Sequence, residues 1–438
     1  MKKGRKRAAL IISVLLAVGL LSGCAAGGEE GAPSSAEGDV TLTLLSDNTQ
    51  DALNSAKAMI AAFEEKNPNI KVEVETRPGG DEGDNLVKTR LSTGDMTDII
   101  MYNSGSLMQA LNPEVNLLDL TNESLMDNVM DTFKPTVTYN GKIYGVPAGS
   151  TMAGGWFYNK KVYEQLGLTV PETWEELMVN NETIKAAGIT PVIGTYKDSW
   201  TSQLVVLADY YNVQSDAPGF ADDYTAGTAK YATTPAALRS FEKLQEIFNK
   251  GYLNKDFLAT TYDAGLKMLV EGTGAHYPML TFAIPPLVQN YADQIEDIGF
   301  FPQPGDRADD HGLTVWMPGA AYIYKNTEHP EEAKKFVSFI ASPEGMAASA
   351  TVSMPTGPYV INGAEMPEDV APAVKDMVPY FESGKTAPAL EFLSPIKGPS
   401  LPQITVEVGA GIKSSAEGAE VYDKDVEKQA KQLGLEGW

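Results

Sequence analysis

Hydrophobic and polar residues follow two different periods along the chain. Residues 39–46, 69–77 and 97–103 show the alternation or short apolar run of β-strands, whereas 51–68 and 82–95 place apolar side chains at helical spacing. The order strand, helix, strand, helix, strand is typical of a parallel sheet covered by helices. Ligands bind beyond the carboxyl ends of the strands in such sheets, so we expect a site in the loops 46–50 and 102–106.

The same pattern continues through the rest of the chain. Residues 141–147 predict a strand, 154–168 a strand that runs into a helix, and 170–188 a helix that begins with a capping box of Thr173 and Glu176. Further helices are expected over 200–211, 235–250, 330–345 and 419–435. About 400 residues follow Asp39, which suits two domains of roughly 200 residues better than one core.

The first 23 residues have the order of a secretory signal peptide. The basic segment MKKGRKR precedes an apolar run of 14 residues, which is shorter than the roughly 20 that a membrane-spanning helix needs. The run leads to LSGC, whose Cys24 is the chain's one cysteine. This ending resembles a bacterial lipobox, which implies cleavage before Cys24 and a diacylglycerol on its sulfur; a plain cleaved signal peptide is the alternative. Residues 24–39, rich in Gly, Ala, Ser and Glu, predict a flexible tether.

Charge and composition narrow the class of partner. Cleavage before Cys24 removes five basic residues and takes the formal charge from −24 to −29. A surface this acidic repels phosphate backbones, so nucleic acid is not expected as a partner. One cysteine forms no disulfide framework, and the three histidines are too far apart in sequence for a zinc motif. We therefore expect no metal and no cofactor.

Several stretches together carry a resemblance to a known family. Residues 139–177 read YNGKIYGVPAGSTMAGGWFYNKKVYEQLGLTVPETWEEL. Residues 91–103, 274–287, 326–345 and 422–438 also match motifs of this family, and all the motifs keep the family's order along the chain. These segments resemble the family 1 extracellular solute-binding proteins of ABC importers, the group that includes maltose-binding protein. The resemblance covers nearly all of residues 40–438.

The resemblance implies a fold and a role. The fold is α/β, a two-lobed periplasmic-binding-protein fold of type II-like form, with discontinuous lobes, a hinge and a ligand cleft between the lobes. Lobe 1 would comprise 40–149 and 318–362, and lobe 2 would comprise 150–317 and 363–438. The role is that of a monomeric, non-enzymatic protein, lipid-anchored at the outer face of the bacterial cytoplasmic membrane. It would bind a mono- or oligosaccharide and deliver it to the permease subunits of an ABC transporter.

Candidate site residues follow from the chemistry of a sugar, which has apolar C–H faces and polar hydroxyl edges. Family cleft positions supply the aromatic candidates Tyr102, Trp200, Phe282 and Trp316, and the strand-end loops supply the polar candidates Asp47, Asn48 and Asn103. Each aromatic could instead pack in the core, and Asp47 could instead cap the next helix. Asp98 is expected to fix a loop rather than to touch ligand.

Other functions stay open at this point. A binding protein for a polyamine or a phosphodiester would share the fold, and salt dependence of binding would separate a charged ligand from a neutral sugar. A secreted glycosidase would need a pair of carboxylates at a set spacing, which the sequence does not exclude. Gly105 and Ser106 stand where maltose binders carry charged sugar contacts, which argues against maltose itself.

Overall fold

The computed structural model describes residues 39–438. The signal peptide, Cys24 and the tether, all predicted within residues 1–39, lie outside the described residues apart from Asp39 itself. No helix in the described part is long and apolar enough to cross a membrane.

The first of the two large sheets has five strands in the order β2-β1-β3-β12-β6. β1 pairs in parallel with both β2 and β3, and β12 runs antiparallel to β3 and β6. The strands are β1 (Val40–Asp47), β2 (Ile70–Arg77), β3 (Ile99–Tyr102), β12 (Ala320–Ile323) and β6 (Gly145–Pro147). Strands predicted from hydrophobic alternation thus form the parallel part of this sheet.

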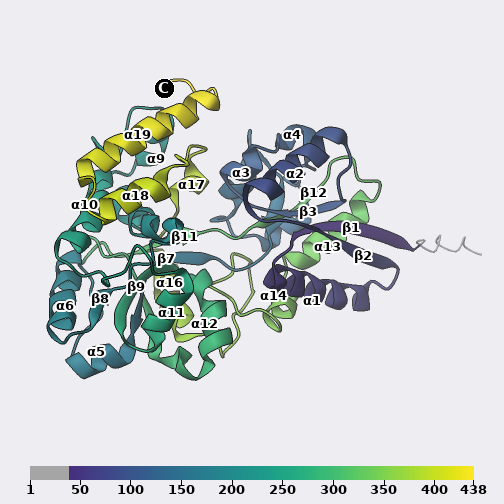
Figure 1. The fold of residues 1–438 in the computed structure, drawn as a ribbon. Coiled ribbons are helices and arrows are strands. Elements are labelled where there is room, and N and C mark those ends of the chain that lie inside the picture. Colours follow the sequence, from purple (N-terminus) through teal and green to yellow (C-terminus); the bar gives the residue numbers. More distant parts are fainter. Residues whose placement is uncertain (1–38) are drawn as a thin grey trace, which may run out of the picture. The chain divides into compact units, whose positions relative to one another are not determined.

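Helices accompany this sheet in Figure 1. They are α1 (Gln50–Lys66), α2 (Gly80–Thr93), α3 (Ser106–Gln109), α4 (Pro113–Asn116), α13 (Pro330–Ile340) and α14 (Pro343–Ala350). Helix α1 buries Ala56, Met59, Ile60 and Phe63, which recur at helical spacing, and the ring of Phe63 packs against Phe336 of α13. Gly94 ends α2 in the left-handed conformation, with φ at 74°, which glycine adopts without steric cost.

The second sheet has six strands around the buried strand β7 (Met152–Asn159). β7 pairs antiparallel with β9 (Gly274–Leu280), β10 (Ile298–Pro302) and β11 (Leu313–Trp316); β8 (Thr190–Val192) and β13 (Thr386–Pro388) pair in parallel with β9 and β11. Trp156 of β7 is fully buried and its indole N–H donates to Gln303.

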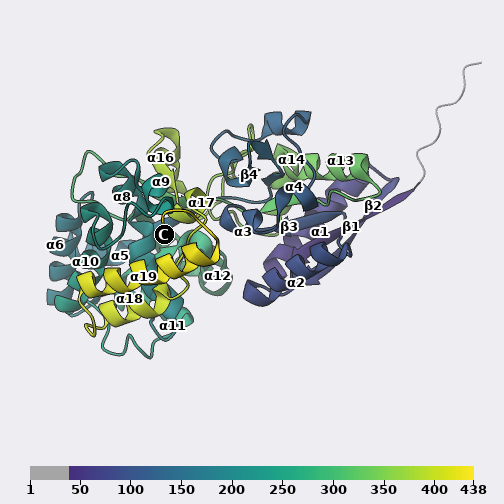
Figure 2. The same ribbon diagram turned by 90° about the horizontal axis from the view of Figure 1, so that it is seen from above.

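The helices of this second part, seen beside its sheet in Figures 1 and 2, follow β7 in sequence. They are α5 (Lys160–Leu166), α6 (Trp174–Ala186), α7 (Leu204–Ala208), α8 (Tyr210–Asp216), α9 (Phe220–Thr225), α10 (Pro235–Asn249), α11 (Tyr262–Val270), α12 (Ile284–Tyr291), α15 (Pro372–Lys375), α16 (Val378–Glu382), α17 (Leu390–Leu393), α18 (Leu401–Gly409) and α19 (Ser415–Gln432). Helix α6 begins with the predicted capping box of Thr173 and Glu176, with both reciprocal hydrogen bonds present.

Two predicted helices are wrong in extent. The single helix expected over 200–211 is a 3₁₀ turn (Ser199–Gln203) followed by α7 and α8, which meet at Asp209. The buried carboxylate of Asp209 bonds to Lys243 of α10, and the periodicity of the sequence does not reveal this tertiary contact. The helix expected over 330–345 ends at Ile340, and α14 begins at Pro343. A proline inside a helix removes one backbone donor and clashes with the preceding turn, so it starts a new helix here, with Ser342 as N-cap.

The chain passes between the two sheets three times. Residues 148–151 join β6 to β7, residues 317–319 join β11 to β12, and residues 351–371 join α14 to α15, which packs on β10. The predicted lobe boundaries at 149/150, 317/318 and 362/363 lie in or next to these segments, and the division into lobes 40–149 plus 318–362 and 150–317 plus 363–438 stays a prediction.

Candidate functional site

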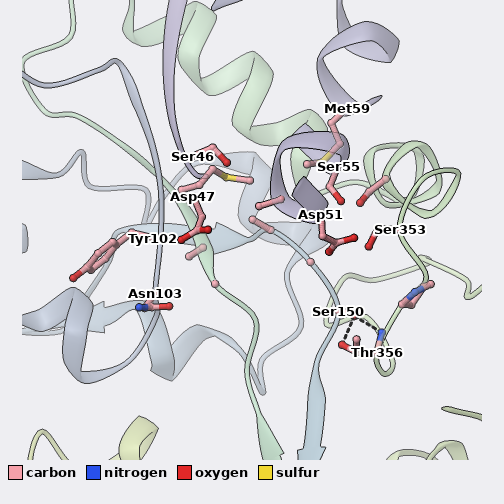
Figure 3. A pocket seen from close by; sticks show the side chains of 18 of the residues that line it. Ser46, Asp47, Asp51, Ser55, Met59, Tyr102, Asn103, Ser150, Ser353 and Thr356 are labelled. Carbon is pink, nitrogen blue, oxygen red and sulfur yellow. Dashed lines mark hydrogen bonds between the residues drawn. The ribbon is translucent and has the colours of Figure 1, made fainter. Parts of the chain in front are cut away.

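A pocket of about 340 Å³ opens where β1 and β3 end, at the place where parallel sheets bind ligands. Figure 3 shows Asp47, at the end of β1, and Asp51, in the first turn of α1, reaching into it, and Ser150 and Thr356 facing them from two of the crossing segments. Its other hydroxyl groups come from Ser46, Ser55, Ser349 and Ser353, and it also contains Arg77, Asn103, Met59, Met101, Met354 and Tyr359. The lining thus mixes hydrogen-bonding groups with apolar side chains.

Asp47, predicted as a ligand contact, lies in this pocket and also supports the local chain. Its Oδ1 accepts from the Thr49 N–H at 2.9 Å, just before α1 begins at Gln50. Its Oδ2 lies 3.8 Å from Arg77 Nη1. The cap-like interpretation and the ligand interpretation are therefore compatible, because a carboxylate has more acceptor sites than these two contacts occupy.

Tyr102 lines the same pocket but is tightly held. Its ring is 3% exposed, its hydroxyl donates to Asp84 Oδ1 at 2.7 Å, and the Arg77 guanidinium lies 5.0 Å from its ring centroid. Burial, with the bond to Asp84, raises the pKa of Tyr102 well above its usual value, so the phenol stays protonated. One ring face is thus occupied by Arg77, and sugar stacking on Tyr102 remains a prediction.

The other predicted contacts divide into three groups. Asn103 lines the pocket beside Tyr102, whereas Asn48 is exposed and does not line it. Trp200 and Phe282 do not line it; they lie in 3₁₀ turns at Ser199–Gln203 and Thr281–Ala283, and both are half-buried. Trp316 is 6% exposed, at the end of β11.

Trp200 and Phe282 belong to an aromatic cluster that also contains Tyr262. The Trp200 ring centroid lies 5.4 Å from that of Tyr262 and 5.6 Å from that of Phe282, and the latter two are 6.0 Å apart. Such tilted rings present apolar faces of the kind on which a sugar stacks. Sequence reasoning missed Tyr262, since TTYDAG lies outside every stretch that resembles the family.

The five tryptophans differ in whether their indole N–H groups have a hydrogen-bond acceptor. Those of Trp156, Trp174, Trp316 and Trp438 donate to Gln303, Glu246, Glu391 and the Thr225 carbonyl, respectively. That of Trp200 has no acceptor among the described residues. The bond from Trp316 to Glu391, at 2.5 Å, and its small exposed fraction favour packing over ligand contact for Trp316.

The crossing segments form the wall of the pocket opposite α1. The Ser150 and Thr356 hydroxyls lie 3.1 Å apart, the Thr356 N–H donates to Ser150 Oγ, and Thr151 donates through its N–H and its hydroxyl to the Pro358 carbonyl. The same segments that the chain uses to pass between the sheets therefore contact the pocket. The sequence contained no signal for these hydroxyls beyond their place next to a predicted boundary.

Asp98 fixes a loop, as its sequence context suggested. It accepts from the backbone and hydroxyl of Thr43 and from the hydroxyl of Thr327, and it does not line the pocket. Burial alone would raise the pKa of Asp98, but these hydrogen bonds outweigh burial and lower it, so the carboxylate is charged at neutral pH. No group of three or more metal-ligating side chains occurs among the residues of the described unit.

Comparison with known proteins places these features in context. A sequence model of the bacterial extracellular solute-binding protein family matches residues 46–347. The multiple sugar-binding protein of Streptococcus mutans is 26% identical over 353 residues, which cover 78% of this chain and 80% of that protein. The melibiose/raffinose/stachyose-binding protein MelE of Bacillus subtilis is 24% identical, with 80% of each chain covered.

Solved structures agree with the fold. RafE in complex with raffinose superimposes with a TM-score of 0.72 at 23% identity, covering 89% of this chain and 99% of RafE. A chitin oligosaccharide binding protein has the same TM-score at 22% identity, covering 90% and 99%. The two-lobed α/β periplasmic-binding-protein fold expected from the sequence is thereby confirmed.

Proposed function

Because this chain belongs to the bacterial extracellular solute-binding protein family, whose members capture solutes rather than convert them, we propose that it binds a neutral mono- or oligosaccharide and delivers it to the permease subunits of an ABC transporter. The relatives named above that bind melibiose, raffinose, stachyose or several sugars support a sugar rather than another solute. The observation that carries the proposal is the pocket at the ends of β1 and β3, where carboxylate, amide and hydroxyl groups converge.

The chemistry of the pocket matches a polyhydroxylated guest. A sugar hydroxyl both donates and accepts, so it pairs with acceptors such as Asp47 and Asp51, with the amide of Asn103, and with hydroxyls such as Ser150. The aromatic cluster of Trp200, Tyr262 and Phe282 supplies the flat apolar faces that the ring C–H groups need. The ligand contacts predicted from the sequence stay proposals: Asp47, Asn48, Tyr102, Asn103, Trp200, Phe282 and Trp316. Asp47, Asn103 and Trp200 are the best supported by their surroundings, whereas Asn48 lies outside the pocket and Trp316 is held by Glu391.

Binding would be coupled to movement at the crossing segments. Hinge closure around ligand is the known motion of periplasmic binding proteins. Residues 148–150 and 354–356 line the pocket, and Ser150 and Thr151 bond to Thr356 and Pro358, so a ligand there would contact the crossing segments directly. Closure of this kind would offer the permease a different surface when sugar is bound.

Isothermal calorimetry against a panel of saccharides tests the proposal. The panel holds melibiose, raffinose, stachyose, xylo-oligosaccharides and chitin oligosaccharides, and we expect at least one to bind with micromolar affinity, about −8 kcal/mol. Affinity for a neutral sugar should change little between low and high salt, whereas a polyamine or phosphodiester ligand would bind more weakly as salt rises. Recovery of the bound sugar uncut excludes glycoside hydrolysis, and no heat of binding for any member of the panel would refute the sugar proposal.

Anchoring and oligomeric state are proposed separately. A lipid on Cys24 would hold the protein at the outer face of the cytoplasmic membrane after cleavage of residues 1–23. Two acyl chains suffice for stable attachment. Expression of the full chain with labelled palmitate should label the protein and place it in the membrane fraction, whereas Cys24→Ala should abolish both; unlabelled, released wild-type protein would contradict the anchor. Sedimentation of the mature part should give the mass of a monomer.

A further inference from the structure

Arg77 is a buried cation at the wall of the pocket that the protein itself satisfies poorly. It is the last residue of β2, is 6% exposed, and lines the pocket. A guanidinium carries five N–H donors. Among the described residues its one hydrogen bond joins Nη1 to the Pro78 carbonyl at 3.2 Å, and its Nε is buried without a partner. Buried charged donors are costly unless they are paired, so this guanidinium has unused capacity for an acceptor.

The nearest carboxylate does not use that capacity fully. β1 and β2 pair in parallel register so that Asp47 lies beside Arg77, at the carboxyl end of both strands. Arg77 Nη1 lies 3.8 Å from Asp47 Oδ2, which is attraction at a distance but too long for a direct hydrogen bond. An oxygen within hydrogen-bond reach of both atoms can accept from the arginine and donate to the aspartate, and a hydroxyl group of a ligand can do both.

Tyr102 restricts the position of the guanidinium. The Arg77 Cζ lies 5.0 Å from the Tyr102 ring centroid, within the range of a cation–π contact. The Tyr102 hydroxyl is in turn fixed by Asp84, so the ring cannot swing away without losing a partly buried hydrogen bond. Arg77 is therefore held in one place between an aromatic face and a carboxylate, which is the preorganisation that selective binding needs.

We propose that Arg77 is a specificity-determining residue of this pocket, and that together with Asp47 it binds one hydroxyl group of a neutral sugar. The guanidinium donates to the hydroxyl oxygen, and the hydroxyl proton is donated to Asp47. The pocket lining carries the two carboxylates Asp47 and Asp51 against the single cation Arg77, so a neutral hydroxyl is preferred over the carboxylate of an acidic sugar. This inference rests on the proposed sugar-binding function and names the group of the ligand that it recognises.

Calorimetry on variants of the mature protein tests it, with the sugar of the panel above that the wild-type protein binds most tightly. Arg77→Gln should weaken binding by about tenfold to a hundredfold, because a hydrogen bond to a charged group is lost. Arg77→Lys should recover part of the loss. The matched control is Arg90→Gln, because Arg90 lies in α2, bonds to Glu75 and does not line the pocket. The affinity of this variant should stay within about twofold of the wild-type affinity.

Two further measurements distinguish recognition from support of the fold. One monodeoxy analogue should bind the wild-type protein at least tenfold more weakly than the parent sugar does. Arg77→Gln should bind this analogue and the parent sugar equally well, and so should Asp47→Asn. Glucuronic acid, as an anionic probe, should not bind. The comparison of each analogue with the parent sugar is made within one protein, so it remains decisive even where Arg77→Gln lowers the melting temperature, because lower stability weakens the binding of both sugars alike.

The outcomes separate this inference from the proposed function. Wild-type protein that binds no sugar overturns both. Wild-type binding that Arg77→Gln leaves within threefold, or that every monodeoxy analogue weakens equally in wild type and variant, overturns the role of Arg77 alone. Stronger binding of glucuronic acid than of the neutral sugar overturns it as well, since Arg77 would then pair with a carboxylate.

Discussion

Two ion pairs of equal length lie in opposite environments, and they allow burial to be tested as the cause of stability. Lys243 Nζ lies 2.6 Å from Asp209 Oδ1 with both side chains 1% exposed. Lys66 Nζ lies 2.6 Å from Glu344 Oε2 with the two side chains 58% and 50% exposed. We predict that Lys243→Met lowers the free energy of unfolding by about 3–5 kcal/mol, whereas Lys66→Met changes it by about 1 kcal/mol or less.

The magnitude follows from what Lys243→Met leaves behind. Asp209 would keep only the side-chain donor of Asn212, at 2.7 Å, while its Oδ2 already has no partner among the described residues. The Pro304 carbonyl, which accepts from Lys243 at 2.9 Å, would lose that donor as well. An uncompensated buried charge and an unpaired acceptor together cost several kcal/mol, although methionine fills nearly the same volume.

The pH dependence of Lys243→Met has a definite sign. Burial raises the pKa of Asp209 above its ordinary 3.8, and the Lys243 ammonium opposes that shift. Removal of the ammonium raises the folded-state pKa further, so the folded variant binds a proton that the unfolded chain has already released. Its stability relative to wild type therefore falls as pH rises from about 4 through the folded-state pKa, and recovers in acid.

Urea unfolding followed by circular dichroism, at pH 7 and pH 5, measures these differences. The double variant Lys243→Met with Asp209→Asn should regain much of the loss, because no buried charge remains. Sugar affinity should not change, since neither residue lines the pocket. If Lys243→Met is no more destabilising than Lys66→Met, or if the double variant is as unstable as the single one, burial of the charge is not the cause and the reasoning fails.

Further predictions concern binding, acid stability and local structure. Trp200→Ala should weaken sugar binding at least tenfold by calorimetry and leave the melting temperature of the sugar-free protein nearly unchanged, whereas Trp316→Phe should lower the melting temperature because the bond to Glu391 is lost. Burial lowers the pKa of His276 from 6.5 to about 3, so stability should fall as pH drops below about 6.5, by roughly 3 kcal/mol at pH 4, and His276→Gln should flatten that slope in acid unfolding. Thr173→Ala should cost about 1 kcal/mol in urea unfolding through loss of the α6 cap, and no change would contradict the capping-box geometry.

Local patterns predicted most of the secondary structure because they depend on neighbours in sequence. Alternating apolar residues indicated β1 and β2, the spacing of Met59 and Phe63 indicated α1, and Thr173 with Glu176 marked the start of α6. The family resemblance, carried by ordered motifs rather than by any one residue, led to the two-lobed fold that structural comparison confirms. The helix predicted over 330–345 ran through Pro343 and was wrong there, although proline begins helices and interrupts them.

What needed the tertiary structure is how residues far apart in sequence meet. No local pattern states that Arg77 faces Asp47 and Tyr102, or that Ser150 meets Thr356, because those contacts depend on strand register and on segments that cross between the sheets. The sequence alone also gave no way to tell the roles of Trp200 and Trp316 apart. In the structure Glu391 accepts from the Trp316 indole, whereas no described residue accepts from the Trp200 indole. Sequence periodicity determines which face of an element is apolar, whereas only the packed chain decides which polar groups remain unpaired at a pocket and so are available to a ligand.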